Sequence, residues 1–80
     1  MSASYTVGRS PQADIHVDDE YASPLHARLY QDDAGQVWVE DLASTNGTFV
    51  NDVRAPLGTP VRVGPGDTVR VGRTALPWRP

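Results

Sequence analysis

Residues 61–71 read VRVGPGDTVRV, and this stretch decides the class of fold. Val61–Val63 and Val69–Val71 alternate apolar and charged side chains with the period of a β-strand. The four residues between them, Gly-Pro-Gly-Asp, are strong turn formers. We therefore interpret the stretch as the two arms of one hairpin in an all-β protein.

On both sides of this stretch, the chain contains further short segments in which apolar and polar residues alternate, separated by turns. The candidate strands are Tyr5–Val7, Ile15–Val17, Leu25–Leu29, Val37–Val39, Phe49–Val50 and an edge strand at Ala75–Trp78. Seven glycines and seven prolines interrupt every window that could form a long helix. Regular short strands with frequent turns indicate an antiparallel β-sandwich, with a small barrel as the alternative.

Two further predictions concern one strand and one loop. In the segment Leu25–Leu29, alternation places Leu25, Ala27 and Leu29 on one face and His26 and Arg28 on the other. The polar run at residues 32–35, Asp-Asp-Ala-Gly, is typical of a hairpin loop.

Composition excludes several functions. A chain of 80 residues forms one domain or part of one, and it has no cysteine and only two histidines. Its net charge of −3 is opposite in sign to that of most nucleic-acid binders. No apolar run is long enough to cross a membrane, and no signal peptide opens the chain. We expect a soluble, cytoplasmic domain with no metal and no cofactor, and without nucleic-acid or membrane contacts.

Three polar loop segments are not explained by strand patterning. They are Gly8–Pro11, Ser23–His26 and Asp41–Thr48. Their chemistry fits an anionic ligand, because Arg9 offers a planar fork of donors and Ser23 and Thr45 offer hydroxyl groups. Asn46 carries both a donor and an acceptor, which suits the backbone of an extended peptide. Gly47 after it permits a positive φ and a tight turn.

These segments, taken together, resemble a known family. Gly8-Arg9-Ser10, Ser23-x-x-His26, Ser44-Thr45-Asn46-Gly47-Thr48-x-Val50-Asn51 and Gly66-Asp67-x-Val69-x-Val71-Gly72 follow one another in the order and spacing of the forkhead-associated (FHA) domain. The match covers roughly residues 5–76, and its local wording is similar to that of small actinobacterial members. The resemblance implies an FHA/SMAD-like β-sandwich whose loops at one end bind phosphothreonine peptides in serine/threonine kinase signalling, without catalysis.

The resemblance also assigns roles by position. Arg9 and Ser23 would contact the phosphate. Thr45 would add a phosphate contact or line the pocket for the threonine methyl group. Asn46 would hydrogen-bond the peptide backbone next to the phosphothreonine.

Five further residues receive supporting roles from the resemblance. Gly8, His26 and Gly47 would be structural, with His26 bracing the loops from below. Tyr21 and Pro24 lie in the loop that helps to select the third residue after the phosphothreonine. Because that loop contains three acidic residues and no basic one, we expect an apolar or basic peptide side chain there.

The start of the chain departs from the family pattern. We divide the sequence into a tail, residues 1–4, and an FHA-like domain, residues 5–80. The family usually has one or two strands before this point, so either the domain is minimal, or an N-terminal strand was removed or comes from another chain. The alternative function is therefore a structural module with a degenerate phosphate site that assembles through exposed sheet edges, its oligomeric state left open. A hydrolase built on Ser23 and His26 is disfavoured, because the sequence shows no separate oxyanion motif.

Overall fold

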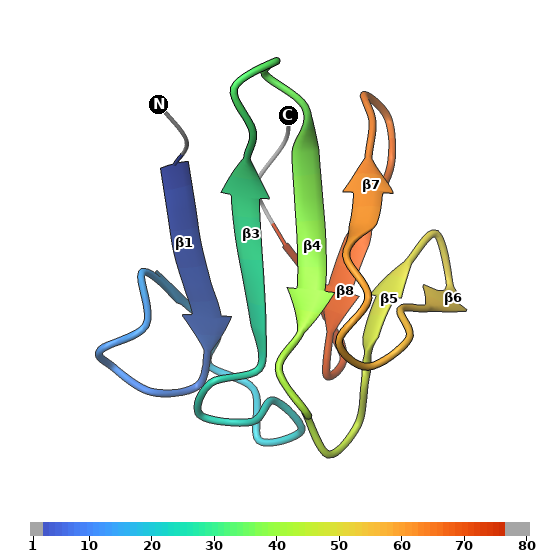
Figure 1. Cartoon of the computed structure of the whole chain (residues 1–80). Helices are drawn as coiled ribbons and strands as arrows, with labels where there is room; N and C mark the ends of the chain where they lie inside the picture. The colour runs from blue at the N-terminus through green and yellow to red at the C-terminus, as the bar shows by residue number, and fades with distance from the viewer. Residues whose placement is uncertain (1–2, 77–80) are drawn as a thin grey trace.

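The computed structural model describes residues 3–76, and within this range the chain is built of strands and loops (Figure 1). The strands are β1 (Ala3–Gly8), β2 (Ile15–His16), β3 (Ala27–Gln31), β4 (Val37–Asp41), β5 (Thr48–Val50), β6 (Val53–Arg54), β7 (Val61–Val63), β8 (Val69–Val71) and β9 (Thr74–Ala75). In this part of the chain, no helix is long and apolar enough to cross a membrane.

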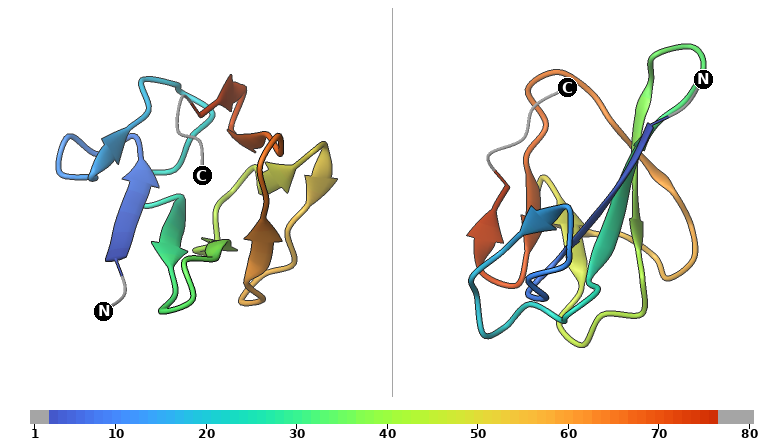
Figure 2. Two further views of the ribbon diagram at one scale, coloured as in Figure 1. Left: turned by 90° about the horizontal axis from the view of Figure 1, so that it is seen from above. Right: turned by 90° about the vertical axis from the view of Figure 1, so that its left-hand side faces the viewer.

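Two sheets form the sandwich. One has the strand order β2-β1-β3-β4-β7 and the other the order β6-β5-β8-β9. The two layers face each other in both views of Figure 2. The expected β-sandwich is confirmed. The strand pairs are antiparallel except for β1 and β2, which run parallel because the connection between them passes through a loop rather than a hairpin.

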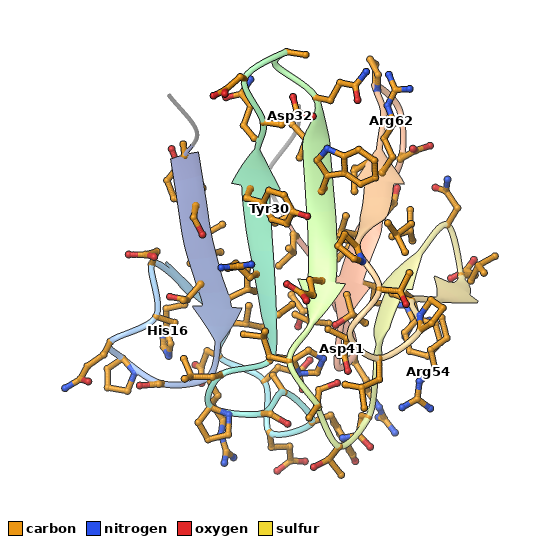
Figure 3. The ribbon with its side chains drawn as sticks, in the orientation of Figure 1. His16, Tyr30, Asp32, Asp41, Arg54 and Arg62 are labelled. Carbon is orange, nitrogen blue, oxygen red and sulfur yellow. The ribbon has the colours of Figure 1, made fainter. Side chains whose placement is uncertain are left out.

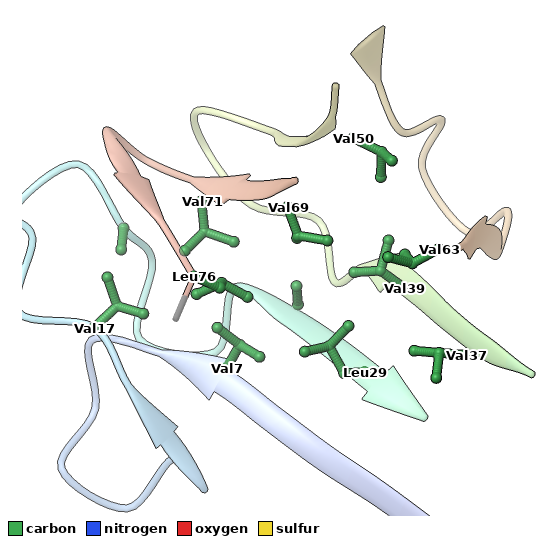
Figure 4. Close-up of a cluster of buried hydrophobic side chains, with 12 residues drawn as sticks. Val7, Val17, Leu29, Val37, Val39, Val50, Val63, Val69, Val71 and Leu76 are labelled. Carbon is green, nitrogen blue, oxygen red and sulfur yellow. The ribbon is translucent and has the colours of Figure 1, made fainter. Parts of the chain in front are cut away.

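The core lies between the sheets and consists of small and branched apolar side chains (Figure 4). Its buried members are Val7, Val17, Ala22, Ala27, Leu29, Val37, Val39, Val50, Val63, Val69, Val71 and Leu76. Alternation along each strand sends these residues inward, since successive side chains point to opposite faces of a sheet. Burying each valine or leucine contributes about 1.5–3 kcal/mol. Within residues 3–76, the fully packed cluster between the sheets is aliphatic.

The hairpin expected for residues 61–71 is wrong. β7 pairs with β4 in one sheet, whereas β8 pairs with β5 in the other. The turn itself forms as its composition predicts, with the Asp67 N–H donating to the Gly64 carbonyl and the Gly64 N–H donating to the Asp67 carboxylate. The turn carries the chain from one sheet to the other. Val63 before it and Val69 after it both belong to the core that the two sheets share.

The hairpin loop expected at residues 32–35 is present and joins β3 to β4. Asp32 organises it by accepting hydrogen bonds from the backbone N–H groups of Ala34 and Gln36 and from the indole N–H of Trp38. These hydrogen bonds lower the pKa of Asp32 below its ordinary value of 3.8, with the Trp38 bond as the largest cause.

The face assignment for Leu25–Leu29 is wrong at its start. β3 begins at Ala27, so Leu25 lies in the preceding loop and is 54% exposed, while His26 is fully buried. Alternation fails here because the backbone leaves the strand conformation before Ala27. The imidazole of His26 is needed by backbone groups of two neighbouring loops, as described below.

The ends of the domain differ from the sequence interpretation. β1 begins at Ala3, so Ala3 and Ser4 belong to the first strand and not to the tail. The last described strand is Thr74–Ala75, and the remainder of the expected strand Ala75–Trp78, from Pro77 on, lies outside the described residues. On the outer edge of β1, the N–H of Thr6 is capped by the carboxylate of Asp14 at 2.9 Å.

Candidate functional site

Three loops meet at one end of the sandwich, at the bottom of Figure 1. They connect β1 to β2, β2 to β3 and β4 to β5, and they contain the three polar segments singled out in the sequence. Asp41 and Arg54 lie at this loop end in Figure 3, whereas Asp32 and Arg62 lie at the opposite end. The topology therefore brings together the candidate residues Arg9, Ser23, Thr45 and Asn46.

The end of β1 is packed directly against the backbone of the β2–β3 loop. The N–H groups of Arg9 and Ser10 donate to the carbonyl oxygens of Ser23 and Pro24, at 3.0 and 3.2 Å. A Cβ atom at Gly8 would lie 2.0 Å from the carbonyl oxygen of Pro24, so only glycine fits this approach. The result is that Arg9, whose side chain is exposed, emerges beside Ser23.

His26 connects two of the loops from within the molecule. Its Nδ1 accepts a hydrogen bond from the N–H of Ser23 at 3.0 Å, so the proton of the neutral ring resides on Nε2. Nε2 donates to the carbonyl oxygen of Gly47 at 2.7 Å. Since the imidazole is fully buried and both nitrogens are engaged, it fixes the distance between the β2–β3 and β4–β5 loops.

The same two loops are joined again at the surface. The N–H of Thr45 donates to Oγ of Ser23 at 3.1 Å, and Nδ2 of Asn46 donates to the carbonyl oxygen of Tyr21 at 2.7 Å. Because Oγ of Ser23 is the acceptor in its bond, the hydroxyl hydrogen remains able to donate to an anion. The side chains of Arg9, Thr45 and Asn46 are exposed, and each belongs to one of the loops that meet at this end.

A buried polar cluster supports the β4–β5 loop, and the sequence interpretation did not identify it. Asp41 accepts hydrogen bonds from the hydroxyl groups of Ser44 and Thr48 and from the N–H of Ser44. Oγ of Ser44 in turn accepts the N–H of Gly47 at 2.9 Å. The signal available in the sequence was an aspartate at the end of a strand followed by serine three residues later, a common local capping arrangement.

Gly47 lies in a restricted place under a side chain from the second sheet. Its φ is +90°, and a Cβ atom there would come within 2.8 Å of Nε of Arg54. The guanidinium of Arg54, from β6, is therefore packed against the backbone next to Asn46. Glycine serves both the positive φ and this contact.

The loop containing Tyr21 is fixed by an aspartate. Asp19 accepts the N–H of Tyr21 through one oxygen, and the N–H of Arg73 and the hydroxyl of Thr74 through the other. These hydrogen bonds, that from Thr74 first, lower the pKa of Asp19 below its ordinary value of 3.8. Tyr21 borders a shallow pocket with Asn46, while Pro24 is exposed and lies outside the lining of that pocket.

The geometry does not form a nucleophile–base pair. His26 contacts the backbone N–H of Ser23 and not its hydroxyl, and that hydroxyl instead accepts a hydrogen bond from Thr45. In residues 3–76, no group of three histidine or acidic side chains is placed to hold a metal ion. The arrangement can bind an anion through a guanidinium and hydroxyl donors held on a rigid base.

Comparisons with known proteins agree with this geometry. The FHA domain family matches residues 5–72. The chain is 47% identical over 75 residues to the FHA domain-containing protein FhaB of Mycobacterium tuberculosis, covering 92% of this chain and 46% of FhaB. It is 41% identical over 71 residues to the oxoglutarate dehydrogenase inhibitor of Corynebacterium diphtheriae, covering 89% of this chain and 47% of the inhibitor.

A solved structure supports the same assignment. The N-terminal FHA domain of Saccharomyces cerevisiae Rad53p, in complex with a phosphothreonine peptide, superposes with a TM-score of 0.80 at 28% identity. The match covers 88% of this chain and 56% of that one.

The chain belongs to the FHA family, whose domains are non-catalytic modules that recognise phosphothreonine peptides in kinase signalling. It spans about half the length of the curated relatives it matches.

Proposed function

We propose that this chain reads phosphothreonine through Arg9, Ser23 and Thr45, with Asn46 holding the peptide backbone. The observation that carries the proposal is the hydrogen bond from the Thr45 N–H to Oγ of Ser23. It unites two loops and orients the serine hydroxyl so that its hydrogen can donate outward. Arg9, tied to Ser23 through its own backbone, supplies the positive charge.

The chemistry follows from the charge of the ligand. A phosphothreonine carries between about −1.5 and −2 charges at neutral pH and three strong acceptor oxygens. Each charge-assisted hydrogen bond contributes about 1.5–3 kcal/mol. The supporting contacts of His26, Asp41 and Gly8 exist before a ligand binds, so little ordering of the loops is required on binding.

Asn46 distinguishes a peptide from a free anion. Its Nδ2 donates to Tyr21, which holds the side-chain amide in one orientation and leaves Oδ1 as an acceptor for a peptide N–H. Burial of the threonine methyl group would favour phosphothreonine over phosphoserine by about 0.8 kcal/mol, or roughly fourfold in affinity.

The test is a calorimetric titration of the domain with one peptide, once with phosphate on its threonine and once without. We expect binding only of the phosphorylated form, and a loss of at least tenfold for Arg9→Ala. Arg62→Ala is the matched control, because Arg62 lies at the opposite end of the sandwich (Figure 3). Equal affinity of the two peptides, or normal binding by Arg9→Ala, contradicts the proposal.

The setting we propose is a cytoplasmic serine/threonine kinase pathway, in which the domain recruits a phosphorylated protein. The net charge of −3 supports a protein partner over nucleic acid. The edge-assembly alternative has less support at β1, because the Asp14 carboxylate occupies the Thr6 N–H that an added strand would use.

A further inference from the structure

Two neighbouring residues of the β4–β5 loop carry groups that can react with each other. Asn46 has a side-chain amide, and asparagine is one of the thermolabile residues of proteins. Gly47 follows it and has no Cβ to hinder the approach of its backbone nitrogen to that amide. The chain has one other asparagine, Asn51, which is followed by Asp52 and is therefore more hindered. Position 46 is thus where the sequence most favours deamidation.

The reaction needs water as its only co-reactant. The nitrogen of Gly47 loses its proton to solvent and bonds to Cγ of Asn46, and the Cγ–Nδ2 bond breaks as Nδ2 takes up a proton and leaves as ammonia. Water then opens the cyclic imide. Cleavage of the new bond to Cγ gives aspartate, whereas cleavage of the bond to the main-chain carbonyl carbon gives isoaspartate. The sum is amide plus water to acid plus ammonia, without a change of oxidation state.

The folded loop engages the nucleophile of this reaction. The N–H of Gly47 donates to Oγ of Ser44 at 2.9 Å, and the Gly47 carbonyl oxygen accepts from Nε2 of His26 at 2.7 Å. Gly47 is also buried and lies against the side chain of Arg54, since a Cβ there would come within 2.8 Å of Nε. While these contacts last, the nitrogen neither exchanges its proton with solvent nor turns toward the side chain before it.

The amide that would be attacked is held by a different loop. Nδ2 of Asn46 donates to the carbonyl oxygen of Tyr21 at 2.7 Å, and this bond spans 25 positions of the sequence. The side chain is exposed, so water reaches it, but ring closure with Gly47 requires that the bond to Tyr21 break. The reaction therefore proceeds through an opened loop, in which both reacting groups have lost their partners.

The products do not fit the place that the amide occupies. A carboxylate at position 46 has only acceptors, so it repels the Tyr21 carbonyl oxygen instead of donating to it. Its negative charge also opposes the dianion of a phosphothreonine bound by the same loops. Isoaspartate lengthens the main chain before Gly47, which displaces that glycine from its contact with Arg54.

We propose that Asn46 is a deamidation site that the closed loop suppresses, and that its conversion permanently switches off phosphopeptide binding. A bound phosphopeptide keeps the loop closed and spares the residue. Domains without a ligand therefore lose their activity with age, whereas occupied domains retain it. The loss of binding rests on the proposed function, because Asn46 must face the peptide, but the reaction itself does not.

The experiment follows conversion of Asn46 by peptide mapping and mass spectrometry during incubation at mildly alkaline pH. We expect the folded domain to react at least about tenfold more slowly than the chain in denaturant, because only the opened loop reacts. The phosphothreonine peptide titrated above, added at about 100 times its dissociation constant, should slow the folded domain about a further hundredfold. The same peptide without phosphate is the control and should leave the rate unchanged. In denaturant, Asn51 should convert more slowly than Asn46.

A pair of variants identifies the contact that suppresses the reaction. Ser44→Ala removes the acceptor of the Gly47 N–H, whereas Thr48→Ala removes another hydroxyl of the same buried cluster and leaves that acceptor in place. We expect Asn46 to react about fivefold faster in Ser44→Ala than in Thr48→Ala, equivalent to one hydrogen bond. Arg54→Ala, which uncovers Gly47 without touching the cluster, should give a smaller rise and serves if Ser44→Ala does not fold. Equal rates in all three variants and the parent overturn the assignment to Gly47.

The effect on binding is measured on the product. Asn46→Asp reproduces one product, and the aged domain, separated by its added charge on an ion-exchange column, contains both. Each should be folded by circular dichroism, since the side chain is exposed, and should bind the phosphopeptide at least about tenfold more weakly than the parent.

The outcomes separate this inference from the proposed function. If the folded domain converts as fast as the denatured chain, or if a phosphopeptide that binds gives no protection, the suppression is overturned. If Asn46→Asp binds normally, the switch is overturned, and the phosphate site tested by Arg9→Ala stands. If phosphate makes no difference to binding, the proposed function is overturned, and the ratio of folded to denatured rates still decides whether the loop suppresses the reaction.

Discussion

The two ends of the sandwich are built from similar turn residues but are held together differently. At the end opposite the binding loops, Asp32 bonds to residues two, four and six positions away. Asp67 bonds to Gly64 three positions away and to the side chain of Asn51 sixteen positions away. At the loop end, local bonds such as that between Ser44 and Asp41 are joined by bonds between residues separated by 21, 22, 25 and 54 positions.

The difference shows which end can be altered without effect on binding. A turn closed by local bonds, such as that around Asp32, fixes mainly itself, so a change there is felt as a small loss of stability. Contacts between distant segments fix the relative positions of three loops, so a change there moves the side chains that would face the ligand.

The largest effect is expected from Gly8→Ala at the loop end, with Gly66→Ala at the opposite end as its comparison. Gly8→Ala places a Cβ 2.0 Å from a backbone oxygen, which cannot move without separating β1 from the β2–β3 loop. We expect a loss of about 3–5 kcal/mol, measured by chemical denaturation, or failure to fold. Gly66→Ala, at the opposite end, has a φ of +86° and no neighbour within 4 Å of its Cβ, so it should cost only about 1–2 kcal/mol. Equal losses for the two variants would contradict the comparison.

The next effect concerns the buried imidazole. His26→Ala leaves the Ser23 N–H and the Gly47 carbonyl without their partner and opens a cavity, which should cost about 2–4 kcal/mol. Phosphopeptide binding should also weaken by more than tenfold, measured at a temperature where the variant is still folded. Asp32→Asn is the control at the other end, and it should bind normally. A folded His26→Ala variant with normal affinity would show that the loops hold their positions without the imidazole.

A smaller effect, on binding but not on folding, is expected from Ser23→Ala. The serine hydroxyl is part-exposed, so the Thr45 N–H that it accepts can turn to water. We expect a change in unfolding free energy below about 1 kcal/mol and a loss of affinity of about tenfold, equivalent to one charge-assisted hydrogen bond. Calorimetric titration and thermal unfolding measure the two quantities, and a normal affinity would remove Ser23 from the phosphate site.

The smallest effect is a dependence of stability on pH. The pKa values of Asp19 and Asp32 are both lowered below 3.8 in the folded protein, so each carboxylate stabilises the fold above that pH. The contribution is lost as the pH falls through the lowered values. Asp19→Asn and Asp32→Asn should therefore be less stable than the parent at neutral pH, with the difference vanishing in strong acid. Only Asp19→Asn should also weaken phosphopeptide binding, because Asp19 holds Tyr21, whose carbonyl oxygen orients Asn46.

The sequence predicted what depends on neighbouring residues. The loop around Asp32, the turn at residues 64–67 and the inward valines of β4 and β8 follow from local composition and alternation. The site motifs could also be identified, because their order and spacing together resemble those of one family over most of the chain.

Partnerships between distant segments could not be predicted from the pattern. Alternation states which face of a strand is buried but not which strand lies beside it, so β7 and β8 were assigned to one hairpin. Periodicity also has no meaning outside a strand, which is why His26 was placed on the wrong face. The stacking of Arg73 on Tyr21 depends on a bridge by Asp19 between two loops, and nothing local to either residue indicates it.

The crossing turn between β7 and β8 also determines how the domain folds. A hairpin could close early and serve as a nucleus, but this turn ends with its two strands in different sheets, paired to β4 and β5. The strands on its two sides therefore find their partners only when segments 19 to 26 positions away in the sequence have arrived. Proteins dominated by such distant pairings fold in milliseconds to seconds, whereas those with local contacts fold far faster. Within the C-terminal third, the pairing of β8 with β9 is local, whereas β7 and β8 gain their sheet partners only when β4 and β5 are in place.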